Sequence, residues 1–397
     1  MTDTTAPIPG LVTQPGQILP LEASNNLSLW ARWRADGAAI ALGTALITWH
    51  GARFGQWVVD DAAITFAYAR SIDEGLGPVQ QPGAEPGEGY SNPAWLGLLV
   101  AGRRLGLFDH RTIFDVPDLV LYPKMLGVLC TVGILVAVAS AARSLVSRSW
   151  LVTGLAGFLL AGNVSFVAWM FSGLEGPLYA LLATILAALL IRAATGVPHA
   201  PDVAVASGLL ALAAALTRPD GAVLAGAYPL LLLLSLRRGE LWPRVGAAAM
   251  SLAVFTVPYA AFLAWRYAFF GRLAPNTAVA KAQEPPDAEL FTRTTGGLLT
   301  FMGWGAVLLT AALVGAVLAR RTMPRTAMAA VLLPLTLTLC AFGILEPDWM
   351  GTHRFAAPVW PLGGLALTLS AVNLAERSTP TAGTTDGGGG WVRAQRR

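Results

Sequence analysis

The amino-acid sequence predicts an all-α polytopic membrane protein with about ten transmembrane helices. Hydrophobic residues make up 55% of the 397-residue chain and charged residues only 13%, whereas about 25% of the residues in ordinary soluble domains are charged. The mean hydropathy is +0.57, and apolar runs of about 20 residues, the length that crosses a bilayer as a helix, recur along the chain. Cys130 and Cys340 both lie inside such runs, which argues against a disulfide framework or a cysteine metal cluster.

The first predicted span covers residues 36–52. The later apolar runs that could each cross the membrane are 119–142, 150–171, 176–193, 203–217, 220–236, 245–268, 297–319, 327–345 and 355–375. The run 203–217 is only marginally long enough at about 1.5 Å of rise per residue, so we expect a tilted or partly buried hairpin there. A shorter run, 93–102, stops at Arg103 and Arg104 and is not counted as a span.

Clusters of basic residues between the runs predict which loops are cytoplasmic, because lysine and arginine are enriched in short loops on that side. Arg32 and Arg34 precede the first run, so we expect a cytoplasmic N-terminus. Four later clusters fall on that same side only if all ten runs cross the membrane and 93–102 does not. These clusters are Arg143/Arg148, Arg237/Arg238/Arg244, Arg320/Arg321/Arg325 and Arg393/Arg396/Arg397. The basic pI therefore reflects topology, and we expect no nucleic-acid partner.

This topology predicts an organisation in three parts. Residues 1–31 form a disordered cytoplasmic lead that lacks the basic and apolar regions of a signal peptide. Residues 32–375 form the transmembrane domain, with a long first outer loop at 53–118 in which 93–108 lie along the membrane interface as a juxtamembrane helix. Residues 376–397 are rich in glycine and threonine, and we expect a disordered cytoplasmic tail.

The polar segments expected on the outer side hold groups suited to chemistry at a lipid phosphate. Asp60 and Asp61 stand side by side just after the first span, where one of them could remove a proton from an acceptor hydroxyl. Cations in apolar surroundings could neutralise a departing phosphate. The candidate substrate-binding residues are Glu175, Arg218, Asn276, Lys281, Asp348, His353, Arg354 and Tyr90.

Each of these residues also has an ordinary structural explanation. Two aspartates at the end of a span can cap a helix, and Glu175 can cap the helix that follows it. Basic residues at span ends, such as Lys281 and Arg354, often extend toward lipid headgroups. Aromatic residues near span ends, Tyr90 among them, commonly anchor a protein at the membrane interface. Taken singly, the residues leave the function open.

Taken together and in order, six short motifs resemble those of bacterial C-type (GT-C) membrane glycosyltransferases, in particular the branch related to actinobacterial terminal arabinofuranosyltransferases. The motifs are "DDAAITFAYAR" from residue 60, "EGLGPVQQPGAEPGEGYSNPAW" from residue 74, "SGLEGPL" at 172–178, "ALTRPDG" at 215–221, "FGRLAPNTAVAK" at 270–281 and "EPDWMGTHRFAAP" at 346–358. Each motif is weak alone, but the six cover nearly the whole membrane portion of the chain.

This resemblance implies transfer of a sugar from a polyprenyl-phosphate donor, usually with inversion, on the extracytoplasmic face of the bacterial plasma membrane. The acceptor would be an envelope glycan, a lipid or a protein. The resemblance also implies that the catalytic base is an acidic residue of the first outer loop. We expect Asp60 as the first choice and Asp61 as the second, the other one positioning a sugar hydroxyl or a divalent cation.

The remaining roles follow from the same resemblance. Arg354 and Lys281 are expected at the donor phosphate, with Arg218 behind them, because arginine offers a bidentate contact and lysine a point charge. Asn276 and Glu175 are expected to bind sugar hydroxyls or to hold the cations in place. A weak requirement for Mg²⁺ or Mn²⁺ is compatible with the carboxylates, although the sequence shows no closed ligand set.

The sequence departs from the family pattern at three places. Ala62 and Ala63 replace the aromatic residue commonly found after the two aspartates, and a Gly-Gly-Asp becomes Glu346-Pro347-Asp348. No extended soluble domain follows residue 375, so arabinan is not supported as the acceptor. The alternative function is a transporter or flippase of envelope precursors, which would show internal repeats and ionisable groups near mid-membrane. No clear repeat is visible, and the charges lie mostly at span ends.

Overall fold

The computed structural model describes residues 21–276, 286–346 and 350–378, which are almost entirely helical. In chain order the helices are α1 (Leu21–Ala52), α2 (Asp60–Asp73), α3 (Pro93–Arg104), α4 (Asp118–Arg143), α5 (Ser149–Gly162), α6 (Val164–Met170), α7 (Gly176–Thr195), α8 (Pro201–Thr217), η1 (Pro219–Gly226), α9 (Ala227–Leu234), α10 (Leu241–Phe270), α12 (Ala288–Met302), α13 (Trp304–Arg320), α14 (Arg325–Gly343), η2 (Arg354–Ala356) and α15 (Val359–Ser378). A short antiparallel hairpin, β1 (Thr112–Ile113) and β2 (Val116–Pro117), lies in the first loop. The helical fold predicted from the sequence is confirmed, with this hairpin as a small addition.

Four helices in the described part of the chain are long and apolar enough to cross a membrane: α4, α7, α10 and α14. Two bent pairs raise the number to six if each pair is one span. The expectation of about ten crossings therefore stays a prediction. Helix α10 differs from the other three because most of its apolar surface faces away from the protein.

Two of the predicted spans are broken rather than continuous. The run 150–171 forms α5 and α6, which meet at 84°, and the run 297–319 falls on α12 and α13, which meet at 92°. Asn163 starts α6 as a cap, since its side chain accepts a hydrogen bond from the backbone N–H of Phe166 at 2.9 Å. Gly303 joins α12 to α13 with φ +83°, a backbone conformation that favours glycine. Hydropathy alone does not detect either break.

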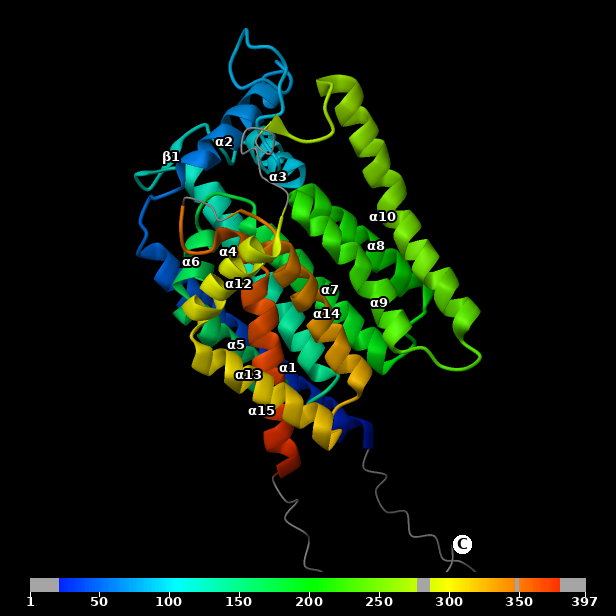
Figure 1. The fold of residues 1–397 in the computed structure, drawn as a ribbon. Coiled ribbons are helices and arrows are strands. Elements are labelled where there is room, and N and C mark those ends of the chain that lie inside the picture. Colours follow the sequence, from blue (N-terminus) through cyan, green and yellow to red (C-terminus); the bar gives the residue numbers. More distant parts are fainter. Residues whose placement is uncertain (1–20, 277–285, 347–349, 379–397) are drawn as a thin grey trace, which may run out of the picture.

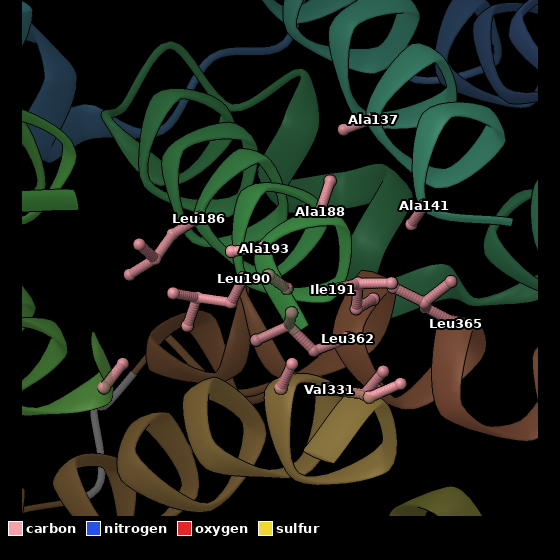
Figure 2. Close-up of a cluster of buried hydrophobic side chains, with 14 of the residues drawn as sticks. Ala137, Ala141, Leu186, Ala188, Leu190, Ile191, Ala193, Val331, Leu362 and Leu365 are labelled. Carbon is pink, nitrogen blue, oxygen red and sulfur yellow. The ribbon is translucent and has the colours of Figure 1, made fainter. Parts of the chain in front are cut away.

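The main hydrophobic core surrounds α7. Figure 2 shows Leu186, Leu190 and Ile191 of α7 in this core. Ala137 and Ala141 of α4 lie on one side of α7, and Val331 of α14 and Leu365 of α15 lie on the other. Alanines of α4 and α7 fill much of this interface, which lets the two helices approach closely. Helices α1 and α5 approach even more closely: a Cβ atom on Gly157 would lie 2.9 Å from the Cα atom of Gly43.

The two ends of the helix bundle are built differently. Helices α2 and α3 lie with the β1–β2 hairpin beyond one end (Figure 1). Toward the other end, the buried Asp36 of α1 accepts hydrogen bonds from Arg143 and Ser149. The predicted helix at 93–108 is observed as α3, and its Trp95 and Leu99 are buried against the rest of the protein. Its place at the membrane interface stays a prediction.

Candidate active site

Five charged side chains form a continuous series of contacts beside the start of α2. Asp61 Oδ2 lies 3.4 Å from Arg354 Nη1, and Arg354 Nη2 lies 3.8 Å from Glu175 Oε1. Glu175 Oε1 also accepts a hydrogen bond from Arg218 Nη1 at 3.1 Å, and Arg218 Nε donates to Asp220 at 2.9 Å. Asp61 is the most exposed member, with 34% of its side chain accessible, and Glu175 the most buried, with 3%. The ion-pair series therefore runs from an accessible carboxylate into the protein interior.

Glu175 organises this series from the turn before α7. Its second carboxylate oxygen accepts a hydrogen bond from the Asn92 side chain at 2.8 Å. Burial, the largest single effect, raises the pKa of Glu175, but the charges of Arg354 and Arg218 together with hydrogen bonds from the backbone and Asn92 outweigh it and hold the pKa below its usual value. Glu175 is therefore an anion that binds two guanidinium groups at once.

The turn that carries Glu175 is fixed to the start of α2. The backbone N–H of Val59 donates to Ser172 O at 2.9 Å, and the Trp95 indole donates to Gly173 O at 3.0 Å. Gly173 has φ +88°, and a Cβ atom there would lie 3.1 Å from Ala62. Ala62 is fully buried under this turn. The small residue at position 62 therefore serves packing, while Ala63 is exposed.

Arg354 follows a turn in which two residues other than glycine have positive φ angles. Thr352 and His353 have φ values of +44° and +53°, which are costly for residues other than glycine, above all for the β-branched Thr352. The Thr352 carbonyl accepts hydrogen bonds from Ser165 Oγ at 2.5 Å and from Trp169 Nε1 at 3.1 Å. Two side chains of α6 thus hold the turn that presents Arg354 to Asp61.

The two neighbouring aspartates face different surroundings. Asp61 contacts Arg354, whereas Asp60 is exposed and accepts the backbone N–H of Asp61 at 2.9 Å. The sequence predicts Asp60 as the first choice for the base and Asp61 as the second; of the two, Asp61 is the one that joins the ion-pair series. Both aspartates stand at the first turn of α2, where the helix dipole stabilises their negative charge.

An apolar groove of about 700 Å³ is lined by the two bent helix pairs, α5–α6 and α12–α13, and by helices α14 and α15. Phe301, Val307, Leu335, Trp360 and Gly363 are among the residues that line it. The wall of this groove is mostly apolar and has few polar atoms.

The groove reaches the turn that carries Arg354. Phe301 in its wall packs edge-on against His353, with the ring centroids 5.1 Å apart. Trp360, also in the wall, donates to Ser165 Oγ at 3.1 Å, and Ser165 in turn holds the Thr352 carbonyl. Burial lowers the pKa of His353, so the neutral imidazole is favoured. His353, which precedes Arg354 in the sequence, therefore contacts the wall of the apolar groove.

The other predicted site residues are not part of the ion-pair series. Tyr90 is buried and packs edge-on against Tyr68; burial, Glu88 and Tyr68 raise its pKa to about 12. Asn276 lies against the first loop, where its backbone N–H donates to Glu88 O at 3.0 Å. Lys281 and Asp348 lie outside the described residues.

Two residues that bind members of the series are absent from the set predicted as substrate-binding. Asn92 donates to Glu175, and Asp220 binds Arg218. Both fall inside motifs that the resemblance rests on, at the ends of "EGYSN" and "TRPD". Position within those motifs was the available signal, but sequence alone did not connect either residue with a partner.

The described residues contain no group of three or more His, Cys, Asp or Glu side chains placed to hold a metal ion. The carboxylate of Asp61 has an arginine as its neighbour. The weak requirement for Mg²⁺ or Mn²⁺ stays a prediction.

Two solved membrane protein structures have a similar fold. ArnT from Cupriavidus metallidurans, bound to undecaprenyl phosphate, shares 15% sequence identity with a TM-score of 0.59; the match covers 84% of this chain and 59% of ArnT. The oligosaccharyltransferase of Archaeoglobus fulgidus in its apo form shares 12% identity with a TM-score of 0.50; the match covers 86% of this chain and 51% of that protein. No protein-family model and no curated protein matches the sequence.

At these identities the likeness concerns the fold. The chain spans little more than half the length of either protein. The relation to arabinofuranosyltransferases stays a prediction. The apolar helices and the two neighbours together indicate a multi-pass membrane protein whose fold is similar to that of ArnT.

Proposed function

We propose that this protein is a membrane glycosyltransferase that moves a sugar from a polyprenyl-phosphate donor to an acceptor hydroxyl. One observation carries the proposal: Phe301 in the wall of the apolar groove packs against His353, whose neighbour in sequence, Arg354, contacts the carboxylate of Asp61. A donor of this class has the same three parts in the same order, namely a hydrocarbon chain, a phosphate and a sugar. The fold shared with a protein solved with undecaprenyl phosphate supports this class of donor.

In the proposed reaction, the acceptor oxygen attacks the anomeric carbon of the donor sugar. The bond between that carbon and the phosphate oxygen breaks, and the polyprenyl phosphate leaves with the bonding electrons. Asp61 takes the proton of the acceptor hydroxyl as general base. Arg354 stabilises the negative charge that develops on the phosphate. Attack from the side opposite the leaving group inverts the anomeric centre.

Arg354 is suited to this exchange of partners. Its contacts with Asp61 and Glu175, at 3.4 and 3.8 Å, are longer than the contacts of Arg218 with Glu175 and Asp220, at 3.1 and 2.9 Å. A donor phosphate binding Arg354 would release the Asp61 carboxylate for the acceptor. Asp60, exposed beside it, is assigned to a sugar hydroxyl, and Lys281 remains a further proposed contact to the phosphate.

The proposal places this site on the extracytoplasmic face of a bacterial plasma membrane, as the charge pattern of the loops predicts. The acceptor would be an envelope glycan, a lipid or a protein.

The test is donor turnover by the purified protein in lipid nanodiscs. Candidate polyprenyl-phosphate sugars are added with simple glycoside acceptors, and the released polyprenyl phosphate and the new glycoside are measured. We expect Asp61→Asn to lower kcat by about 10²–10⁴-fold, the usual contribution of a general base, and Asp60→Asn to lower it less. If both variants keep the wild-type rate, the proposed mechanism is wrong. Movement of the intact donor across liposome membranes without release of the phosphate would instead support a flippase.

A further inference from the structure

A buried ion pair joins the first loop to the C-terminal end of α10. Arg266 donates from Nε and Nη2 to Glu88 Oε1 at 3.0 and 2.9 Å, and its Nε lies 2.8 Å from Oε2. The two side chains are only 5% and 2% exposed. Removing two charges from water is costly unless the geometry of the pair is good. Neither residue belongs to the ion-pair series at Asp61, so the pair needs its own explanation.

The same pair organises the turn that follows α10. Arg266 Nη1 donates to Leu273 O at 3.1 Å, and the backbone N–H of Asn276 donates to Glu88 O at 3.0 Å. The Asn276 side chain accepts from Arg272 at 3.1 Å. The turn 271–276 is therefore held at two separate backbone positions, and both contacts depend on where Glu88 and Arg266 lie.

The chain segment that begins at Glu88 also reaches the active site. The backbone N–H of Gly89 donates to Tyr68 Oη of α2 at 3.1 Å. Four residues after Glu88, Asn92 donates to Glu175 at the centre of the ion-pair series. Residues 88–92 thus connect the end of α10 to the helix that carries Asp61 and to Glu175.

We propose that Glu88 and Arg266 are a positioning pair, which holds the turn 271–276 and Asn276 in the arrangement that accepts the sugar donor. The effect on the donor rests on the proposed function. Without the pair, the turn samples other arrangements, and the apparent affinity for the donor falls in proportion to the fraction of molecules that remain competent. The bound complex restores the arrangement, so KM rises while kcat changes little.

The test uses Glu88→Gln, which keeps the shape of the side chain and removes its charge. We expect the donor KM to rise about tenfold, the change that corresponds to a loss of about 1.4 kcal/mol. Independently of activity, we expect faster amide hydrogen exchange in the peptides that cover 271–276 and 85–92. Arg266→Lys, which retains the charge but loses the paired contacts and the bond to Leu273, is the second variant and carries the test if Glu88→Gln does not fold.

The matched control is Glu240→Gln, at the other end of α10. The buried Arg244 of α10 donates from Nε to Glu240, the residue before the helix, at 3.0 Å. The control therefore removes the charge of a second glutamate–arginine pair, more exposed on the glutamate side, far from the turn. It should leave the donor KM and the exchange of 271–276 unchanged. Unchanged exchange in both variants of the Glu88–Arg266 pair would overturn the inference, as would a fall in kcat at constant KM. If the wild-type protein releases no lipid phosphate, the proposed function fails, and hydrogen exchange still decides the role of the pair.

Discussion

Arg218 and Arg354 share the carboxylate of Glu175, yet their surroundings assign them different tasks. Arg218 is held by Glu175 and Asp220, and its guanidinium lies 4.5 Å from the centre of the Phe355 ring. Arg354 has longer contacts and sits next to the accessible Asp61. Arg218 therefore fixes Glu175, and Glu175 in turn contacts Arg354 beside Asp61.

Substitution of each arginine by lysine should separate these tasks. Arg354→Lys loses the forked contact to a phosphate, so we expect kcat/KM for the donor to fall about 10–100-fold, the equivalent of about 1.5–3 kcal/mol for a charged hydrogen bond. Arg218→Lys should mainly lower the thermal unfolding temperature. Both quantities are measured on the same preparations in nanodiscs. The opposite pattern, with stability lost at Arg354 and turnover at Arg218, would contradict the assignment.

Glu175 should also leave a signature in the dependence of stability on pH. Its pKa in the folded protein lies below the ordinary value of 4.5, because Arg354, Arg218 and the hydrogen bonds to the carboxylate together outweigh the effect of burial. The ionised carboxylate therefore stabilises the fold above pH 4.5, and this contribution is lost as the pH falls from there toward the folded-state pKa.

The measurement is thermal unfolding of detergent-solubilised protein between neutral and acidic pH. Glu175→Gln should cost about 3–5 kcal/mol at neutral pH, as expected when one partner of a buried ion pair is removed. The variant should then lose less stability than the wild type below pH 4.5. Parallel losses in the two proteins would show that Glu175 does not contribute to the acid transition.

The residue types of the site were predictable from the sequence, but their partners were not. Asp61, Glu175, Arg218 and Arg354 belong to motifs that carry the family resemblance, and the structure brings these four together. Tyr90 belongs to the same motifs and is instead packed on Tyr68. Short motifs specify residue types, whereas the direction of a side chain depends on contacts between separate segments, which are 43 residues apart for Glu175 and Arg218 and 293 apart for Asp61 and Arg354.

At the scale of single elements, helix α6 has a larger effect than its seven residues imply. Its Ser165 and Trp169 hold the Thr352 carbonyl and so fix the turn before Arg354. The sequence predicted this region as part of one span, because residues 150–171 are mostly apolar and include no charged residue. The break arises from the capping side chain of Asn163, a local hydrogen bond that hydropathy does not measure.

Loss of this cap should weaken the site from a distance. Asn163→Ala removes the acceptor for the Phe166 N–H, and we expect a loss of about 1 kcal/mol in stability. Turnover should fall as well, because the turn that presents Arg354 is less well fixed. Asn163→Ser, which can still cap the helix, is the control and should behave like the wild type in both assays. Equal loss of turnover in the two variants would point to a direct role for the Asn163 side chain instead.

At the scale of the whole molecule, the arrangement of helices places an apolar groove beside the charged site. The bends between α5 and α6 and between α12 and α13 both border this groove, together with α14 and α15. The sequence predicted helices and their order along the chain, but a groove depends on which helices pack side by side. That packing is set by many small contacts, such as the close approach of Gly43 and Gly157, and no periodic pattern encodes it.

If the groove binds the hydrocarbon chain of the donor, filling it should discriminate between donors by chain length. Gly363 lines the groove, and a Cβ atom there would meet no other atom within 4 Å, so Gly363→Phe should fold and occupy the space. We expect the KM for a long-chain polyprenyl-phosphate sugar to rise, while the KM for a short-chain analogue stays the same, because the shorter chain does not reach the blocked segment. Gly246→Phe in α10, where a side chain also meets open space, is the control. An equal rise in KM for both donors would place the hydrocarbon chain elsewhere on the protein.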